Sequence, residues 1–411
     1  GKAPGQREVA LADLPVEGKI LLHEPPLGRR GRVGAVARPR PAEPRFHHRF
    51  AGLVMLADWL GSHDYWFPVQ EVTAEERLKH NQKIAPELLK AVGLDAKPLR
   101  KPLKQVGDKF KSFFEFTPRP LQSILDEVDP HNFNTRLLVV ESETGSGKTE
   151  AALNWFRKLF VAGKVDSLYF ALPTRVAARE LYSRINNYVS SWFPNSDCRP
   201  VTLLAVPGYA QVDGYSVKEL LPEEKKANLW QEDQKSLTLE RHWAGAMPKR
   251  FLAATIAVGT IDQALLSIVQ TAHAHLRSVC LDRSLLVVDE VHASDLYMSR
   301  LLCFLLAHHL GVGGTAMLLS ATLGSRALND YIQITRPEQA LSSFSAAVKK
   351  PYPALTFSDG RVAAAGATER PKEVHFETHD WAFSPENAVD QILAPALRVG
   401  ARVLVVMNTV A

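Results

Sequence analysis

The sequence predicts an α/β fold, in which a parallel β-sheet is covered by helices, over most of the chain after about residue 113. Short β-rich hydrophobic runs recur along this region, and longer amphipathic or Ala-rich stretches lie between several of them. This alternation is typical of βαβ units and therefore of parallel strands. The expected strands are Leu137–Val140, Leu168–Leu172, Val201–Val206, Ile256–Val258, Leu285–Val288 and Ala316–Leu319.

Length and composition indicate a globular protein of more than one domain. The chain has 411 residues, of which 46% are hydrophobic and 23% charged, and a formal net charge of +5. These values exclude a disordered chain, a collagen-like fibre and a disulfide-stabilised miniprotein. The mild positive charge is compatible with nucleic acid binding but does not demonstrate it. The three cysteines include no CxxC pair, and we expect reduced thiols.

No segment has the pattern of a membrane span or a secretion signal. A transmembrane helix needs about 18 apolar residues in a row, and no window approaches that length. The first residues show no apolar core behind a basic lead. We therefore expect no membrane partner and a cytoplasmic location.

The first hundred residues differ in texture from the rest. Residues 1–45 are rich in Gly, Pro and Arg, which indicates a solvated arm or an arm that contacts nucleic acid. Helices are expected over His48–Leu60 and over 74–93, and Lys97–Lys104 is interpreted as an interdomain linker. Its basic residues would extend a nucleic-acid groove or simply be solvated. The first helix carries an apolar stripe made of Phe50, Leu53, Val54, Leu56 and Ala57.

Later segments interrupt the strand and helix alternation. Residues 213–242 form a mixed-charge insertion, and residues 325–372 are looser. Two further strand-like runs follow, Val374–Phe376 and Val403–Met407.

The strongest local signal is a Gly-rich loop, residues 141–149, between a hydrophobic strand and a helical run. Gly145 and Gly147 let backbone N–H groups approach phosphate oxygens, and the following helix N-terminus adds partial positive charge. Lys148 can reach the terminal phosphates, and the Thr149 hydroxyl can bind Mg²⁺. Ser142 stands where the strict pattern has its first Gly, and a simple Gly-Ser turn is the alternative. The expected nucleotide ligands are Thr144, Gly145, Ser146, Gly147, Lys148, Thr149 and Glu150.

An acidic box follows the expected strand Leu285–Val288. A carboxylate at the carboxyl end of a parallel strand sits where α/β sheets bind ligands. Asp289 would hold Mg²⁺, Glu290 would orient or deprotonate the attacking water, and His292 would link this site to a neighbouring motif. Paired with the phosphate loop, the box predicts a nucleoside triphosphatase.

Small residues at another strand end complete this group of motifs. Ser320, Ala321 and Thr322 follow the run Ala316–Leu319. Their hydroxyls can hydrogen-bond the acidic box and report nucleotide state, although such a triplet is often a simple cap.

The order and spacing of these motifs resemble the core of a superfamily 2 helicase. That resemblance implies a RecA-like domain that binds ATP with Mg²⁺, and it makes Gln122 the residue that reads adenine. It also implies that five residues grip the backbone of a nucleic acid, although each could belong to an ordinary turn. These residues are Pro173, Thr174, Arg175, Gly259 and Thr260.

The helix Ala51–Ser62 narrows the family. A carboxylate in an apolar helix is costly unless it is paired or bound to a cation, so Asp58 is a salt-bridged or surface acid or a metal ligand. The sequence of this helix resembles the CRISPR-associated helicase-nuclease of type I systems. The same resemblance is found in three later segments, Ala257–Leu266, His273–Arg277 and Asp289–Met298. By that resemblance Asp58 is a ligand of the divalent transition metal in an HD-type nuclease site.

The chain departs from that family at both ends. The HD site needs several histidines and a His-Asp pair ahead of Asp58, and His23 is the only histidine before residue 46. His47-His48 and His63-Asp64 are interpreted as incidental surface residues. The second RecA-like domain has barely begun, and the motif with its arginine is absent. We expect an incomplete chain or a naturally reduced one.

The resemblance implies four segments. Residues 1–95 would be the C-terminal part of an all-α HD-type nuclease domain with a basic arm, and 96–112 a linker. Residues 113–335 would be the first RecA-like domain, and 336–411 a connection and the start of the second.

The implied function is an ATP-dependent translocase on single-stranded DNA, coupled to a metal-dependent nuclease. An RNA-guided surveillance complex would recruit it to foreign DNA in a prokaryotic cell, and a protein inhibitor or regulator is a further possible partner. Two alternatives stay open, namely an RNA-directed superfamily 2 helicase and a truncated, non-catalytic ATP- or DNA-binding adaptor.

Overall fold

The computed structural model describes residues 44–63, 65–69, 72–195, 199–217, 241–293, 295–366, 386 and 389–404. The chain divides into two units, Gly1–Thr368 and Glu369–Ala411. The first unit holds the sheet and every site discussed below. In the second, the described residues include a π-helical turn, Val389–Leu393, and the short helix α15, Ala394–Arg398.

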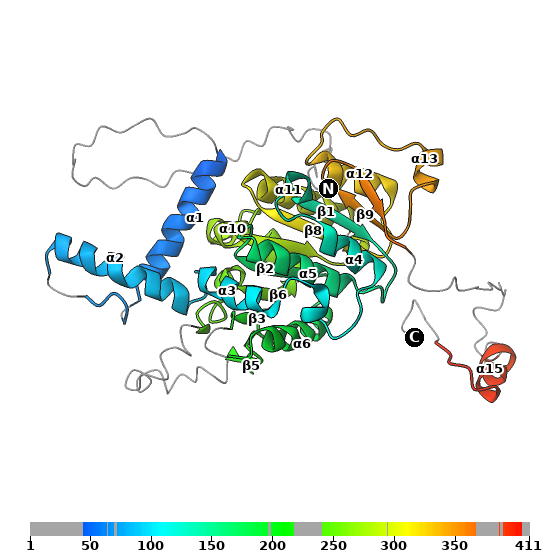
Figure 1. Ribbon diagram of the computed structural model, residues 1–411, viewed down its shortest axis with the longest axis horizontal. Helices are drawn as coiled ribbons and strands as arrows, with labels where there is room; N and C mark the ends of the chain where they lie inside the picture. The colour runs from blue at the N-terminus through cyan, green and yellow to red at the C-terminus, as the bar shows by residue number, and fades with distance from the viewer. Residues whose placement is uncertain are drawn as a thin grey trace, which may run out of the picture. The chain divides into compact units, whose positions relative to one another are not determined.

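The first unit is built on one ten-stranded sheet, in the order β10-β9-β1-β8-β7-β2-β6-β3-β4-β5 (Figure 1). The six central strands, which follow one another in the order β1-β8-β7-β2-β6-β3, are all parallel to one another. Each of them coincides with one of the six predicted runs, which confirms the predicted α/β class. The bounds are β1 Leu137–Glu141, β8 Thr315–Ser320, β7 Ser284–Val288, β2 Ser167–Leu172, β6 Ile256–Thr260 and β3 Thr202–Ala205.

Helices cover both faces of this sheet, and the alternation along each strand explains why. In β1, Leu138 and Val140 contribute to one hydrophobic core, and Leu137 and Val139 to the other. The first core is closed by α3 Lys97–Val106, α4 Pro120–Glu127, α5 Lys148–Val161 and α6 Arg175–Trp192. The second is closed by α1 Pro44–Gly61, α2 Ala74–Ala91, α9 Ile261–Leu265, α10 Ala274–Asp282, α11 Leu296–Gly311 and α12 Ser325–Gln333.

Short antiparallel strands finish both edges of the sheet. On one side β9, Ala354–Phe357, pairs with β1, and β10, Val362–Ala364, pairs with β9. On the other side β4, Gln211–Val212, pairs with β3, and β5, Tyr215–Ser216, pairs with β4. The sheet therefore continues beyond residue 335, through the region expected to be loose, which also includes helix α13, Phe344–Val348.

The segment interpreted as a linker is a helix, and that interpretation was wrong for Lys97–Lys104. Helix α3 buries Leu103 in the first core, and Arg100 pairs with Asp166 while its guanidinium lies 5.7 Å from the Phe160 ring centre. Arg100 therefore fastens the helix to the domain. Pro98 occupies an early helical position, where its missing N–H costs nothing, whereas Pro102 lies inside the helix.

Several expectations fall outside the described residues. These are the arm before residue 44, Cys198, most of the insertion 213–242, the run Val374–Phe376 and the end of Val403–Met407. Cys280 is buried and Cys303 half-buried, and both are free thiols. No helix within the described ranges has the length and apolar character to cross a bilayer.

Candidate nucleotide-binding site

The phosphate loop joins β1 to α5 in a conformation that depends on glycine. Gly145 and Gly147 have φ of +83° and +86°, a region that side chains with a Cβ rarely adopt. The Ser142 N–H donates to the carbonyl oxygen of Ser320 at 3.1 Å, which fastens the start of the loop to β8. Ser142, the departure from the strict motif, is 1% exposed and fits without displacing the backbone.

Lys148 lies inside the loop. Its ammonium donates to the carbonyl oxygens of Ser142, at 2.7 Å, and of Glu143, at 3.1 Å. The side chain is 8% exposed. A cation held within a ring of loop backbone is placed to meet phosphate oxygens at the N-terminus of α5.

Gln122 is hydrogen-bonded to the backbone of the loop. Its amide oxygen accepts from the N–H of Arg119 at 2.9 Å, and its amide nitrogen donates to the carbonyl of Gly147 at 3.0 Å. A Cβ added at Gly147 would lie 2.2 Å from that nitrogen. Gln122 is fully buried, so both ends of its amide bind protein in this conformation. The amide nitrogen has a second N–H and the oxygen a second lone pair, so these two bonds leave room for the contact with adenine, which stays a prediction.

The acidic box lies at the end of β7. The Asp289 N–H donates to the carbonyl of Ala171 on β2 at 2.9 Å, and an Asp289 carboxylate oxygen accepts from the Glu290 N–H at 2.9 Å. Burial, and secondly the charge of Glu290, raise the pKa of the Asp289 carboxyl. Glu290 has a φ of +52°, an uncommon conformation for a residue with a side chain. Backbone strain of this kind is frequent at ligand sites.

His292 of the acidic box contacts Ser320 of the small-residue motif, as the sequence predicts. His292 Nδ1 lies 3.0 Å from Ser320 Oγ and 3.3 Å from a carboxylate oxygen of Glu290. Ser320 Oγ donates in turn to the carbonyl of Thr322 at 2.7 Å. Ala321 contributes its carbonyl, which accepts from the Tyr352 hydroxyl at 2.8 Å. The structure thus brings Glu290, His292 and Ser320 into one chain of contacts.

A cavity of about 410 Å³ joins the two motifs. Lys148, Thr149, Asp289 and Glu290 all line it, so the loop and the box face a common space. The Glu290 carboxylate oxygen that lies 3.3 Å from His292 Nδ1 is buried and makes no hydrogen bond among the described residues. Carboxylate and hydroxyl oxygens around a polar hollow suit Mg²⁺, which prefers oxygen ligands.

The same cavity includes residues that sequence reasoning missed. Arg119, whose guanidinium donates to the Gly145 carbonyl, lies on its wall, as do Phe116 and Arg184. Arg184 on α6 pairs with Glu150, and the Tyr188 hydroxyl donates to the same carboxylate at 3.2 Å. No motif marks Arg184, because only the packing of α6 beside α5 brings it here. Glu150 is therefore bound to α6 in this structure.

The five residues expected to grip nucleic acid differ in accessibility. Pro173, Thr174 and Arg175 are exposed after β2, and the Thr174 hydroxyl accepts from the Ala177 N–H at 3.2 Å as the cap of α6. Gly259 and Thr260 are buried at the end of β6. A Cβ at Gly259 would lie 2.7 Å from the Ala205 carbonyl oxygen, so glycine is required there for strand packing.

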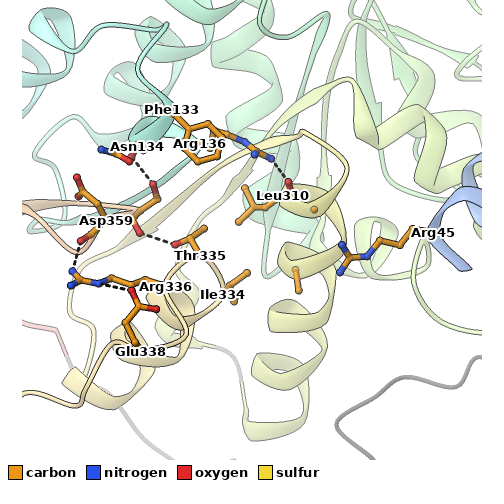
Figure 2. A pocket seen from close by; sticks show the side chains of 13 residues that line it. Arg45, Phe133, Asn134, Arg136, Leu310, Ile334, Thr335, Arg336, Glu338 and Asp359 are labelled. Carbon is orange, nitrogen blue, oxygen red and sulfur yellow. Dashed lines mark hydrogen bonds and ion pairs between the residues drawn. The ribbon is translucent and has the colours of Figure 1, made fainter. Parts of the chain in front are cut away.

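A separate hollow of about 560 Å³ lies at the other end of β1, next to Arg136 (Figure 2). Two of the three arginines that line it already have partners in the protein. Arg136 donates to the carbonyls of Leu310 and Gly314, and Arg336 donates to the Asp359 carbonyl at 2.7 Å and to Glu338 at 3.2 Å. These bonds stabilise the fold, and we do not assign a ligand to this hollow.

Asp58 lies on α1, whose inner face packs on α10. Most of the predicted apolar stripe of α1 is exposed to solvent. Phe50, Leu53 and Val54 are 58%, 54% and 51% exposed. Asp58 is also exposed. Within the described ranges, no three His, Cys, Asp or Glu side chains are arranged to hold a metal. The described residues therefore do not form the nuclease metal site, and we derive no step through that metal.

Gly52 sets the close approach of α1 to α10. A Cβ there would lie 2.3 Å from the His275 carbonyl oxygen, which is backbone and cannot move aside. We expect Gly52→Val to lower the free energy of unfolding by about 1–3 kcal/mol, measured by urea denaturation of the full chain. Gly61→Ala is the matched control, because Gly61 ends the same helix and nothing lies within 4 Å of its Cβ position. Equal effects of the two changes would contradict this packing.

His48 is part of this helix contact, which corrects its interpretation as an incidental surface residue. Its ring centre lies 4.3 Å from that of His275 and 5.3 Å from that of His308. His308 Nε2 lies 2.9 Å from Ser278 Oγ on α10. Burial, and then the neighbouring imidazoles, lower the pKa of His48 to about 4. The cluster is therefore neutral at pH 7.

This cluster predicts a loss of stability in acid. Burial lowers the pKa of His308 to about 4 as well, and it does the same for His309, which follows His308 on α11 but lies against the Thr315 carbonyl oxygen, outside the cluster. These imidazoles stay neutral in the fold while the unfolded chain binds protons below pH 6.5, so stability falls as the pH falls from about 6.5 to about 4. Asp282 acts in the opposite direction, because burial raises its pKa to about 6. Three imidazoles outweigh one carboxyl.

The measurement is the free energy of unfolding as a function of pH, for the wild type and for His48→Gln. Removing one of the three imidazoles should make the slope between pH 6.5 and pH 4 shallower. An unchanged slope would contradict the assignment of His48 to this cluster.

Comparison with known proteins gives a consistent result. A family model described as the HD domain of Cas3 matches residues 22–67. The CRISPR-associated endonuclease/helicase Cas3 of Escherichia coli (strain K12) is 31% identical over 284 residues, which are 66% of this chain and 30% of that protein. The CRISPR-associated nuclease/helicase Cas3 of Streptococcus thermophilus is 25% identical over 368 residues, 88% of this chain and 39% of that protein.

Solved structures agree with the fold. A crystal structure of T. fusca Cas3 with AMPPNP is 25% identical, with a TM-score of 0.61, and the match covers 87% of this chain and 40% of that one. A chain in a CRISPR RNA-guided surveillance complex, pre-nicking, gives a TM-score of 0.53 at 24% identity and covers 86% of this chain and 37% of that one. These comparisons confirm the predicted resemblance. The chain spans 30% to 39% of the length of the two curated relatives named above.

Proposed function

We propose, from the premise that this chain belongs to the Cas3 family of CRISPR-associated nuclease-helicases, that its ten-stranded sheet is the first motor domain of an ATP-dependent translocase on single-stranded DNA. The observation that carries this proposal is the common cavity of the phosphate loop and the acidic box. Lys148, Asp289 and Glu290 face the same space, and the His292–Ser320 contact leads away from it. This is the arrangement that a nucleoside triphosphatase with a nucleotide sensor needs.

In the proposed cycle, the residues of the loop bind and orient ATP. The Gly145 and Gly147 backbone holds the phosphates, and the Lys148 ammonium moves from the loop carbonyls to phosphate oxygens. Thr149 and Asp289 would hold Mg²⁺, which neutralises charge that develops on the phosphates. Glu290 orients the attacking water and accepts its proton.

His292 and Ser320 would carry the state of the nucleotide to the rest of the protein. Both side chains depend on the position of Glu290, because His292 contacts Glu290 and Ser320 in turn. Ser320 ends β8, and its carbonyl accepts from the N–H of Ser142 at the start of the loop. A change at the γ-phosphate therefore reaches two neighbouring strands.

DNA would lie along the carboxyl ends of the strands next to the box. Pro173, Thr174 and Arg175 are exposed at that edge. Contacts to the backbone suit a motor that must tolerate any sequence. We further propose that an RNA-guided surveillance complex recruits the protein and that Asp58 contributes to the metal-dependent nuclease.

The experiment is ATP turnover by the full chain with single-stranded DNA, with RNA of the same sequence, and with no nucleic acid. We expect stimulation by DNA. Stimulation by RNA alone would favour an RNA-directed helicase, and no turnover under any condition would leave an adaptor as the better description.

A further inference from the structure

Three neighbouring strands end in a row beside the proposed DNA path. The parallel register places Leu172 of β2 next to Thr260 of β6, and Gly259 next to Ala205 of β3. The segments that follow β2, β6 and β3 therefore leave the sheet at the same edge. The segment after β3 is Val206–Tyr209. No sequence motif marks it as part of a binding site.

This segment is a tight turn that presents an aromatic ring to solvent. The Tyr209 N–H donates to the Val206 carbonyl at 3.0 Å, and Gly208 has a φ of +83°. Val206 is buried, whereas Tyr209 is 58% exposed. The turn is thus anchored in the core while its tyrosine ring projects from it.

A cavity of about 510 Å³ lies between α6 and the β4–β5 hairpin, close to this ring. Arg179 lines it, and the Arg179 guanidinium carbon lies 5.9 Å from the centre of the Tyr209 ring. Arg179 is exposed, and no described carboxylate forms an ion pair with it. Arg175 stands one helical turn earlier on α6. The other lining residues include Val176, Ser183, Gln211 and the single acid Glu180.

Hydrogen bonds and an ion pair hold the hairpin that forms the far wall of the cavity. Asp213 in the hairpin turn accepts from the Thr202 N–H at 3.0 Å and pairs with Arg241 at 2.8 Å. The Gly214 N–H donates to the Tyr182 hydroxyl at 2.8 Å. These contacts form the hollow without a ligand, and a preformed site lowers the cost of binding.

We propose that Tyr209 and Arg179 form a stacking subsite for one base of a single-stranded nucleic acid. Every base has a flat π-face, so an exposed ring beside a cationic guanidinium binds bases without regard to sequence. The subsite continues the row of strand ends beyond Pro173–Arg175, which are proposed above to contact the nucleic-acid backbone. It rests on the proposed function and adds to it a contact to a base.

The contrast with the hollow of Figure 2 supports this assignment. There, the Arg136 and Arg336 donors are held by backbone carbonyls and a carboxylate. Arg179 has an aromatic neighbour and no carboxylate partner among the described residues, so its guanidinium is available to a ligand.

The test compares binding of an oligothymidine with binding of an abasic oligonucleotide of equal length, by fluorescence anisotropy on the full chain. We expect Tyr209→Ala to raise the Kd for oligothymidine about tenfold and to leave the Kd for the abasic strand unchanged. Tyr209→Phe should keep wild-type binding, since it retains the ring. Arg175→Ala should weaken binding to both strands, because it removes a backbone contact.

Tyr215→Ala is the matched control. Tyr215 lies on β5 of the hairpin beside the cavity and is 66% exposed, but among the described residues only Tyr209 has its ring next to the Arg179 guanidinium. The subsite is overturned if Tyr209→Ala weakens binding to both strands equally, if it leaves oligothymidine binding unchanged, or if Tyr215→Ala has the same effect. Failure of the wild type to bind oligothymidine would overturn the proposed function itself, and the subsite with it.

Discussion

Replacement of Lys148 by alanine is expected to lower DNA-stimulated ATP turnover by about 10²–10³-fold. Lys148 is the cation inside the phosphate loop, and its ammonium is held by the Ser142 and Glu143 carbonyls. Alanine removes the charge that would meet the terminal phosphates. The measurement is release of phosphate under saturating single-stranded DNA, together with the Kd for a fluorescent ATP analogue.

Lys164→Ala is the matched control for this change. Lys164 is an exposed lysine just past the other end of α5, so the same charge is removed from the same helix region. It should leave turnover within about twofold of the wild type. Thermal unfolding of both variants shows whether the loop variant is folded. Wild-type turnover by folded Lys148→Ala would contradict the nucleotide site.

The central sheet could be predicted because its six strands are buried on both faces. Such strands read as continuous hydrophobic runs, and all six runs are strands in the structure. The outermost strands escaped prediction, since β4 and β5 have two residues each and β10 has three. Strands this short give no periodic signal, and their pairing comes from the neighbours that the fold provides.

Helix faces were less predictable than the helices. Helix α1 was expected from its apolar stripe, but Phe50, Leu53 and Val54 are exposed, and Gly52 faces α10 instead. Spacing identifies an apolar face without telling whether another element covers it. Gly52 has no hydrophobic side chain, so no pattern could mark it as the point of contact.

The candidate nucleotide site also has parts that the sequence predicts and parts that it does not. The loop and the acidic box are local motifs, and each is visible along the chain. The Arg119 contact with the loop and the Arg184 contact with Glu150 bring together residues 26 and 34 positions apart. Such contacts depend on how α4 and α6 pack against α5, and only the folded structure shows them.

Replacement of Glu290 by glutamine is expected to separate binding of ATP from its hydrolysis. The amide keeps the shape of the side chain, but it cannot accept the proton of the attacking water. Turnover should therefore fall by about 10²–10⁴-fold, the usual contribution of a positioned base. The Kd for ATP should stay within about threefold, because Lys148, Thr149 and Asp289 are unchanged.

Glu338→Gln provides the control for the loss of one carboxylate charge. Glu338 is 73% exposed in its side chain, pairs with Arg336 and lies away from the loop cavity. This variant should hydrolyse ATP like the wild type. In Glu290→Gln, retained ATP should hold the protein on single-stranded DNA, so its dissociation from an oligothymidine should be slower with ATP than without it. If Glu290→Gln instead loses ATP binding and hydrolysis together, the carboxylate holds the nucleotide, and the acceptor of the water proton must be sought elsewhere. The 3.3 Å contact with His292 makes that imidazole the next residue to replace.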